Sequence, residues 1–467
     1  PYRRQRQMCI RDSINALIMA LFRYLTGYLR DYYKNQRGAL LLTGARQTGK
    51  TYAIRQFGEQ FESFIEINFI ERPELVDLFS DAGSADDILL RISAVTDKPL
   101  IKGKTLIFFD EVQRCSNLIT AIKFLVDEGS YRYALSGSLL GVELKDIRSV
   151  PVGYMGIKEV YPLDFEEFIL NLGVADRVIA HLRESWDAGK PVDEVIHQRL
   201  LELFRLYTIV GGMPAVVANY LAANNLQNVE QAQNDIITLY RQDISQYAEE
   251  DKLKIKEIFD LIPSELDAKN KRFILKRLNE HAKFDRYQND FLWLSNAGVA
   301  IPVYNVEEPK QPLRLACLRN LFKLFSNDVG LLTAQYANGI QAKILSGDIA
   351  INFGAVYENA VAQELVCHGY QPFYFNSKRQ GELDFVISDG EGVIPVEVKS
   401  GKDYERHNAL SNVLSCDEYG INKAYVLCGS NLHKQGKIIY APIYMTIFLR
   451  PQSSGVTIYH PDLTGLK

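Results

Sequence analysis

The stretch "LLLTGARQTGKT", residues 40–51, decides the fold of the first half of the chain. It joins an apolar run to a complete G-x-x-x-x-G-K-[ST] pattern, and a helical pattern follows, which is the strand–loop–helix context of a phosphate-binding loop. Glycines let the backbone N–H groups point at phosphates, the lysine adds charge at the β- and γ-phosphates, and the threonine ligates magnesium. The motif therefore predicts ATP and Mg²⁺ as cofactors. The residues expected to contact the nucleotide are Gly44, Ala45, Arg46, Gln47, Thr48, Gly49, Lys50 and Thr51.

A second motif, "TLIFFDEVQR" at residues 105–114, is typical of a strand buried on both faces that ends in Asp110 and Glu111. Ligands gather at the carboxyl ends of parallel strands, so we expect Asp110 in the magnesium shell and Glu111 as the group that orients and deprotonates the attacking water. Without the loop, two acids at the end of a strand would indicate only a solvated edge.

The next apolar run, "YRYALSGSLLG" at residues 131–141, ends in small hydroxyl residues. Ser136 and Ser138 are candidates to hydrogen-bond the γ-phosphate or the water, although serines at the end of a strand are also common as plain turn residues. Arg148 is a candidate for the charge stabilisation that an arginine supplies in phosphoryl transfer.

Composition narrows the class of protein. The 467 residues are 47% hydrophobic and 24% charged with a net charge of -4, which indicates several globular domains and predicts no general affinity for nucleic acid. The six cysteines are scattered without a C-x-x-C pair, which favours a reduced, cytoplasmic setting. The apolar run "INALIMALF" is far shorter than the roughly 20 residues of a membrane-spanning helix, so no membrane partner is expected.

The patterns divide the chain into seven segments. We expect a non-native leader at 1–13, an N-terminal helix at 14–34, an α/β core at 35–165, a helical subdomain at 166–250, a winged helix at 251–315, a second α/β or α+β block at 316–450 and a tail at 451–467. The arginines of the leader can also be read as a basic arm for nucleic acid. A signal peptide is a further alternative, but no small-residue cleavage site follows the apolar run.

The stretch "GELDFVISDGEGVIPVEVKSGK", residues 381–402, predicts two strands joined by a turn. Glu382 and Asp384 share one face of the first strand, and Glu397 and Lys399 share one face of the second. Asp384 and Glu397 are candidate ligands for magnesium, with Lys399 positioning and helping to ionise the water. Glu358 on the preceding helix is a further candidate ligand. The alternative is an amphipathic hairpin with cross-strand ion pairs on its solvated face.

Several of these stretches together carry a resemblance. They are "GARQTGKT", "LIFFDEVQ", "SGSLLGV", "YPLDFEEF", "VGGMP", "DVGLL", "ELDFVI" and "IPVEVKSGK". The chain from about residue 35 to 450 resembles a bacterial and archaeal group of AAA-family ATPases that carry a C-terminal domain of unknown function. The last part is similar to the PD-(D/E)xK restriction-endonuclease-like superfamily.

The resemblance implies an α/β fold with an AAA-type P-loop NTPase core with a parallel sheet at 35–165 and a PD-(D/E)xK nuclease-like α/β domain at 316–450. Between these parts, the residue patterns predict a helical lid and a winged helix. It implies ATP contacts at Gly44, Gly49, Lys50 and Thr51, and Walker B roles for Asp110 and Glu111. It also implies nuclease-type roles for Glu358, Asp384, Glu397 and Lys399. After "PVG", this chain has Tyr154 where the resemblance predicts a basic residue.

The sequence therefore predicts an ATPase whose nucleotide cycle controls a magnesium-dependent nuclease domain acting on DNA in the cytoplasm. The alternative is a nucleotide-dependent switch whose nuclease-like domain binds a partner or nucleic acid without cleaving it. Whether the chain forms a homo-oligomer is left open by the sequence.

Overall fold

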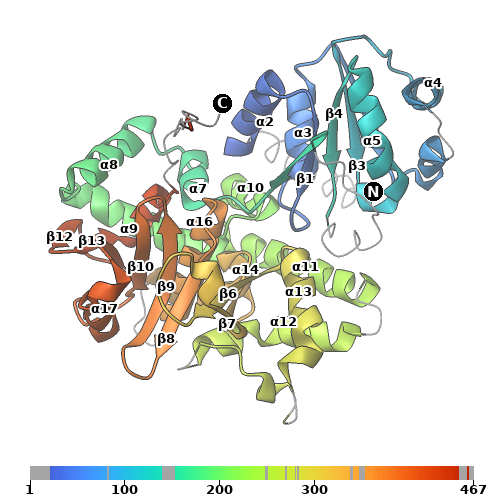
Figure 1. The fold of residues 1–467 in the computed structure, drawn as a ribbon. Coiled ribbons are helices and arrows are strands. Elements are labelled where there is room, and N and C mark those ends of the chain that lie inside the picture. The colour runs from blue at the N-terminus through green and yellow to red at the C-terminus, as the bar shows by residue number, and fades with distance from the viewer. Residues whose placement is uncertain are drawn as a thin grey trace.

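The computed structural model describes residues 21–80, 84–138, 153–247, 251–268, 271–278, 280, 283–336, 340–346, 353–451 and 460–461. The predicted leader at 1–13 and the candidate Arg148 lie outside these residues. The described chain contains two sheets, one of five strands and one of eight, and Figure 1 shows them as separate layers with α7 and α10 in the region between. The five described cysteines form no disulfide.

The first sheet has the strand order β2-β3-β4-β1-β5, and every neighbouring pair is parallel. Its strands are β1 Ala39–Thr43, β2 Ser63–Asn68, β3 Thr105–Asp110, β4 Arg132–Ser136 and β5 Met155–Glu159. Helices cover it: α2 Tyr24–Asn35, α3 Lys50–Gly58, α4 Ala85–Val95 and α5 Ser116–Glu128.

Alternating residues of β1 enter different cores, since Leu41 packs in one cluster and Leu40 and Leu42 pack in another. All six residues of β3 are buried. Both faces of the sheet are therefore covered, as expected for a parallel sheet, and the predicted P-loop α/β fold is confirmed.

The next part of the chain is helical. It comprises α7 Phe165–Asn171, α8 Asp176–Ala188, α9 Glu194–Val210, α10 Pro214–Ala223, α11 Leu226–Tyr247, α12 Lys252–Asp267 and α13 Phe284–Asn296. Gly211 and Gly212 separate α9 from α10, and Pro214 opens α10, where a missing N–H costs nothing. No single described helix meets the length and hydropathy criteria of a membrane span; α9 and α10 meet them only as a pair bent by 119°.

The second sheet has the order β12-β13-β11-β10-β9-β8-β6-β7. Its strands are β6 Ala300–Val306, β7 Cys317–Ser326, β8 Phe373–Ser377, β9 Gly381–Asp389, β10 Gly392–Val398, β11 Ala424–Cys428, β12 His433–Gln435 and β13 Ile438–Pro442. Strands β6 and β7 form an antiparallel pair, and β6 also pairs in parallel with β8. The predicted boundary between 315 and 316 thus falls inside a hairpin that extends the second sheet, and a winged helix at 251–315 is not confirmed.

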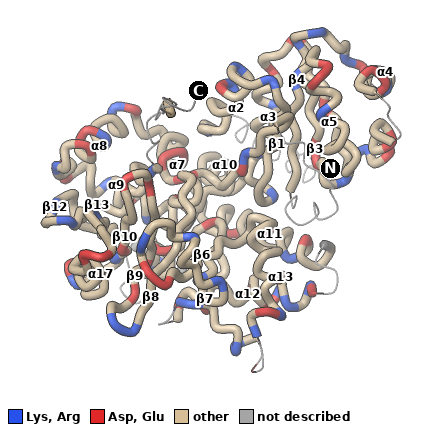
Figure 2. The backbone as a smooth tube through the Cα atoms, viewed as in Figure 1, with Lys and Arg blue, Asp and Glu red and all other residues tan. Residues whose placement is uncertain are grey.

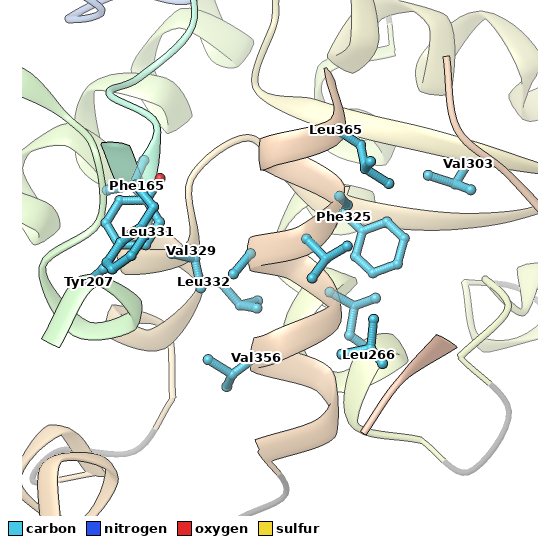
Figure 3. Packing of buried hydrophobic residues seen from close by; sticks show 14 of the residues in the cluster. Phe165, Tyr207, Leu266, Val303, Phe325, Val329, Leu331, Leu332, Val356 and Leu365 are labelled. Carbon is cyan, nitrogen blue, oxygen red and sulfur yellow. The ribbon is translucent and has the colours of Figure 1, made fainter. Parts of the chain in front are cut away.

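The remaining helices pack against the second sheet and against the helical part of the chain. They are α14 Val329–Ala334, α15 Ile340–Ser346, α16 Phe353–Cys367 and α17 Asn408–Leu414. One apolar cluster includes Phe165 of α7, Tyr207 of α9, Leu332 of α14 and Val356 of α16 (Figure 3). Because these residues share one core, the segment that follows the first sheet, the helical region and the second sheet are packed together.

Candidate functional site

The backbone of the phosphate-binding loop requires glycine at two positions. Gly44 and Gly49 have φ values of 118° and 91°, a region that side chains disfavour. A Cβ atom on Gly44 would lie 2.3 Å from the carbonyl oxygen of Val160. The loop therefore needs both glycines of the motif to run from β1 into α3.

The motif lysine is buried and folded onto its own loop. Its Nζ atom donates hydrogen bonds to the carbonyl oxygens of Gly44 at 2.8 Å and Ala45 at 2.6 Å. The Thr48 hydroxyl donates to the same Ala45 oxygen at 2.9 Å. Burial lowers the pKa of Lys50 to about 8, although nearby Glu111 and Asp110 oppose this. Backbone oxygens thus satisfy the ammonium group in this state.

Asp110 lies at the end of β3, where hydroxyl and amide groups surround its carboxylate. Thr51 Oγ1 lies 3.3 and 3.2 Å from the two carboxylate oxygens, and Asn68 Nδ2 donates to Oδ2 at 3.2 Å. The Ser136 hydroxyl also donates to Asp110. Burial raises the pKa of Asp110 to about 6, with Ser136 opposing. A carboxylate beside a threonine hydroxyl is a set of hard oxygen donors that suits Mg²⁺.

Glu111 begins the turn after β3 with a φ of 57°. Its Oε2 atom accepts hydrogen bonds from Gln113 Nε2 at 2.6 Å and from the Ser138 hydroxyl at 3.3 Å. Arg46 Nε donates to the same Ser138 hydroxyl at 3.3 Å. Ser138, predicted to hydrogen-bond the γ-phosphate or the water, therefore contacts the predicted base and connects it to the loop.

These groups line a common cavity of about 300 Å³. Its lining includes nine of the predicted site residues: Arg46, Gln47, Gly49, Lys50, Thr51, Asp110, Glu111, Ser136 and Ser138. Gly44 instead lines a cavity of about 520 Å³ that also touches β5 and β6. Tyr154, at the position where a basic residue was predicted, accepts a hydrogen bond from Ala39 N through its backbone oxygen.

Two acids from outside the phosphate-binding loop and the β3 motif pair with arginines of the loop or beside it. Arg46 forms an ion pair with Asp243 of α11 at 3.1 Å, and burial raises the pKa of Asp243 to about 6 against the effect of Arg46. Glu167 of α7 pairs with Arg23 Nε at 3.0 Å. Neither was predicted, because both lie far from the loop in sequence.

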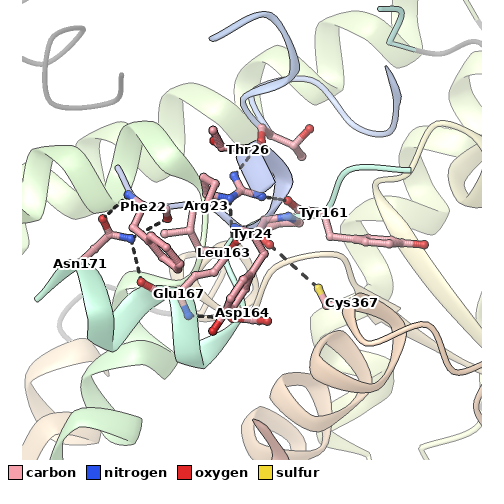
Figure 4. A network of polar contacts seen from close by, with 12 residues as sticks. Phe22, Arg23, Tyr24, Thr26, Tyr161, Leu163, Asp164, Glu167, Asn171 and Cys367 are labelled. Carbon is pink, nitrogen blue, oxygen red and sulfur yellow. Dashed lines mark hydrogen bonds and ion pairs between the residues drawn. The ribbon is translucent and has the colours of Figure 1, made fainter. Parts of the chain in front are cut away.

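Arg23 connects the loop to the start of the helical region. Its Nη1 atom donates to the Thr48 carbonyl oxygen at 3.1 Å and its Nη2 atom donates to the Tyr161 carbonyl oxygen at 2.8 Å. Figure 4 shows Arg23 between Tyr161 and Glu167, with Asp164 close by. One arginine thus contacts both the phosphate-binding loop and the segment that leads into α7.

The second set of predicted residues also comes together. Asp384 of β9 accepts a hydrogen bond from Val398 N at 2.9 Å, and Lys399 Nζ lies 3.2 Å from Glu397 Oε2. Burial and the neighbouring charge of Asp384 raise the pKa of Glu397 well above its ordinary range. Around β8 and β9, basic and acidic segments lie beside one another (Figure 2). The two carboxylates and the lysine therefore form one cluster.

Two lysines that the sequence analysis missed complete this cluster. Lys323 of β7 has a fully buried side chain, and its Nζ lies 2.7 Å from Glu382 Oε1 and 3.9 Å from Asp384 Oδ1. Glu358 forms ion pairs with Lys271 and, at 3.8 Å, with Lys323. Burial would raise the pKa of Asp384, but Lys323 and Lys271 hold it below its ordinary value.

The fit of this cluster to a metal ion is partial. Asp384 and Glu397 are adjacent carboxylates, the hard ligands that suit Mg²⁺. Glu358, predicted as a third ligand, is already balanced by two ammonium groups. Among the described residues, no group of three or more His, Cys, Asp or Glu side chains is arranged to hold a metal ion. Asp384 and Glu397 are thus the pair that fits a divalent cation.

A parallel sheet whose first strand leads into a complete P-loop, with acids at the end of β3, defines a P-loop nucleotide-binding domain. Residues 36–169 match the family model described as an AAA domain, so this part of the chain is similar to that family. Residues 201–343 and 353–445 match two families described as domains of unknown function, DUF8612 and DUF4143. The first of these matches spans the predicted boundaries after 250 and 315. Neither description supports the predicted nuclease character.

Solved structures give further similarities. The Walker-type ATPase PABY2304 of Pyrococcus abyssi is 15% identical over 67% of this chain and 94% of that protein, with a TM-score of 0.41. The Orc1 protein of Aeropyrum pernix in complex with DNA is 13% identical over 67% of this chain and 87% of its own, with a TM-score of 0.30. Cdc6p from Pyrobaculum aerophilum is 13% identical over 75% of this chain and 95% of that protein, with a TM-score of 0.26. No curated protein sequence matches the chain significantly.

Proposed function

We propose that this protein binds and hydrolyses ATP and that its nucleotide cycle controls a magnesium-dependent nuclease domain acting on DNA. The observation that carries the proposal is the meeting of Asp384 and Glu397, on the neighbouring interior strands β9 and β10 of the second sheet, with the partly exposed Lys399. The same chain holds a complete P-loop with its acids around one cavity. Two chemically distinct sites in one chain suit an ATP-regulated enzyme.

At the ATP site, Lys50 would exchange the Gly44 and Ala45 carbonyl oxygens for phosphate oxygens. Thr51 and Asp110 would hold Mg²⁺, which supplies positive charge at the phosphates when bound. Glu111, oriented by Gln113 and Ser138, accepts the proton of the attacking water.

At the second cluster, Asp384 and Glu397 would hold a divalent cation against a phosphodiester. When bound, that cation stabilises the charge that develops on the phosphate. Lys399 stays close to Glu397 and is partly exposed, so its ammonium group can hold the attacking water in place.

A series of direct contacts supports control by the nucleotide. The Tyr240 hydroxyl donates to the Arg46 carbonyl oxygen at 3.2 Å and accepts from Asn327 Nδ2 at 3.3 Å. Asn327 directly follows β7, the strand of Lys323. The adjoining Ser326 exchanges two backbone hydrogen bonds with the Asn359 side chain, at 2.8 and 3.1 Å, and Asn359 follows Glu358 on α16. A shift of the phosphate-binding loop would thus be transmitted to β7 and α16, which carry Lys323 and Glu358 of the cluster.

Tyr240→Phe tests this route because it removes the hydroxyl and keeps the ring. We expect ATP hydrolysis to continue while the effect of ATP on cleavage falls several-fold. Tyr33→Phe is the matched control, since its buried hydroxyl donates to Tyr133 O within the first sheet. Equal effects of the two substitutions would argue against the route.

The function itself is tested by a cleavage assay on single-stranded and duplex DNA and RNA, in Mg²⁺ or Mn²⁺, with and without ATP. We expect DNA cleavage that requires the metal and changes with ATP. A protein that hydrolyses ATP and cuts none of these substrates would contradict the nuclease part of the proposal.

A second candidate function is a nucleotide-dependent switch with a non-cleaving nuclease-like domain. The ion pairs of Glu358 with Lys271 and Lys323 favour it, because they balance a carboxylate that a metal would otherwise use. A switch would show ATP-dependent binding of a partner or of nucleic acid and no cleavage.

A further inference from the structure

Lys323 is an unusual residue for its position. It lies in the run "NLFKLFS" on β7, between Phe322 and Leu324, and its side chain has no exposed surface. Burying an ammonium group is costly unless anionic groups compensate for the lost water. The position therefore indicates that specific partners hold this charge in place.

Three carboxylates from two elements supply that compensation. Lys323 Nζ lies 2.7 Å from Glu382 Oε1, 3.9 Å from Asp384 Oδ1 and 3.8 Å from Glu358 Oε2. It also lies 5.2 Å from the centre of the Tyr374 ring. Glu382 and Asp384 belong to β9 and Glu358 belongs to α16, so one ammonium group joins the strand to the helix.

Asp384 is held from two directions. Its Oδ1 atom faces Lys323, while its Oδ2 atom accepts the hydrogen bond from Val398 N on the strand that also carries Glu397. These contacts fix the carboxylate of Asp384 beside Glu397, at the end of the cluster where Lys399 is partly exposed.

We propose that Lys323 is a positioning residue that acts as a fixed cation at the buried end of the cluster and limits the cluster to one divalent cation, held by Asp384 and Glu397. This inference rests on the metal-binding part of the proposed function. A second divalent cation would have to sit where Lys323 Nζ already contacts Glu358 and Asp384.

The net charge of the cluster is consistent with the binding of a single divalent cation. Four carboxylates, those of Glu358, Glu382, Asp384 and Glu397, face the three ammonium groups of Lys271, Lys323 and Lys399. When all seven are ionised, the cluster carries one net negative charge. One divalent cation together with one phosphodiester anion would make the whole assembly neutral. A second divalent cation would leave a buried positive excess, which is unfavourable.

The test is Mn²⁺ binding by the nucleotide-free protein, measured by calorimetry and by electron paramagnetic resonance. An Mn²⁺ ion is assigned to the cluster when the wild type binds it and the Asp384→Asn variant does not. We expect one such ion in the wild type. Lys323→Met should bind Mn²⁺ about tenfold more tightly or take up a second ion, because the ammonium group 3.9 Å from Asp384 Oδ1 no longer opposes it. Cleavage should nevertheless fall, since Asp384 loses its fixed position.

Glu382→Gln provides an independent variant that keeps Lys323. Glu382 is partly exposed, so the substitution is compatible with folding even if Lys323→Met is not. Without its nearest carboxylate, Lys323 opposes a metal at Asp384 more strongly, and Mn²⁺ affinity should fall several-fold. A merely structural lysine would not give opposite signs for the two variants.

Lys423→Met is the matched control, because Lys423 pairs with Asp389 and Glu391 at the other end of the same hairpin. It should bind Mn²⁺ as the wild type does. If Lys323→Met and Glu382→Gln both bind the same number of Mn²⁺ ions as the wild type, with the same affinity, the proposed role of Lys323 is overturned. A wild type with no Asp384-dependent ion would overturn the proposed metal site together with this inference. Mn²⁺ binding without cleavage would contradict the nuclease function and leave the role of Lys323 supported.

Discussion

Two aspartates, the buried Asp110 in the ATP site and the partly buried Asp384 in the C-terminal cluster, have opposite electrostatic environments. The pKa of Asp110 is raised to about 6 by burial, and the nearby Lys50 donates to backbone oxygens instead of pairing with it. The pKa of Asp384 is held low by Lys323 and Lys271 in spite of burial. The ATP site therefore keeps an unbalanced carboxylate ready for an incoming cation, whereas the cluster contains its own cations.

The largest effect is expected for Lys50→Ala. If the Lys50 ammonium moves from the loop carbonyls to the phosphates, its removal should weaken nucleotide binding and lower ATP turnover by about 10²-fold or more. Steady-state phosphate release and nucleotide titration measure the two effects. Lys104→Ala is the control, because Lys104 forms an exposed pair with Glu62. If Lys50→Ala hydrolyses ATP at the wild-type rate, the P-loop lysine does not take part in ATP hydrolysis.

Glu111→Gln should separate binding from hydrolysis. The amide keeps the size of the side chain but cannot take the proton of water, so single-turnover hydrolysis should slow by about 10²–10⁴-fold with ATP binding retained. The substitution leaves Asp110 and Thr51 in place. An unchanged single-turnover rate would mean that another group is the base.

The ATP site and the C-terminal cluster differ in how much of each can be predicted from the sequence. The P-loop is a contiguous motif whose backbone conformation follows from its glycines. The parallel sheet was predicted correctly, and nine of the predicted site residues line one cavity. The residues that pair with it, such as Asp243, come from a distant helix with no local signal. Lys323 did have a signal, a charge inside the apolar run "NLFKLFS", but the partners of a buried lysine depend on tertiary packing. The pairing of β6 with β8, which places the predicted boundary after 315 inside a sheet, is likewise long-range.

In the C-terminal cluster, Asp384→Asn and Lys399→Ala should each lower metal-dependent cleavage by about 10²-fold or more, because each removes a group that acts on the metal or the water. ATP hydrolysis should remain largely intact, since the two sites use different residues. The alternative, a hairpin stabilised by ion pairs, predicts a loss of stability and no effect on cleavage. Cleavage rates and melting temperatures of both variants, measured together, distinguish these outcomes.

The smallest effect concerns stability and tests the electrostatic contrast directly. The folded-state pKa of Asp110, about 6, lies above its ordinary value of 3.8, so ionisation destabilises the folded protein as pH rises between these values. Asp110→Asn lacks this charge. We expect it to raise the unfolding free energy of the nucleotide-free protein in EDTA by about 1–2 kcal/mol at pH 7.5, and to have little effect near pH 4.

The same substitution at Asp384 should have the opposite sign. Its folded-state pKa lies below the ordinary value of 3.8, so its ionisation stabilises the folded protein above that pH, and this contribution is lost as pH falls through the folded-state pKa. Asp384→Asn also leaves the buried Lys323 with one carboxylate fewer, so its melting temperature at pH 7.5 should fall. Thermal unfolding of both variants from pH 4 to 8 gives the comparison. Shifts of the same sign at pH 7.5 would show that the lysines of the cluster do not balance Asp384.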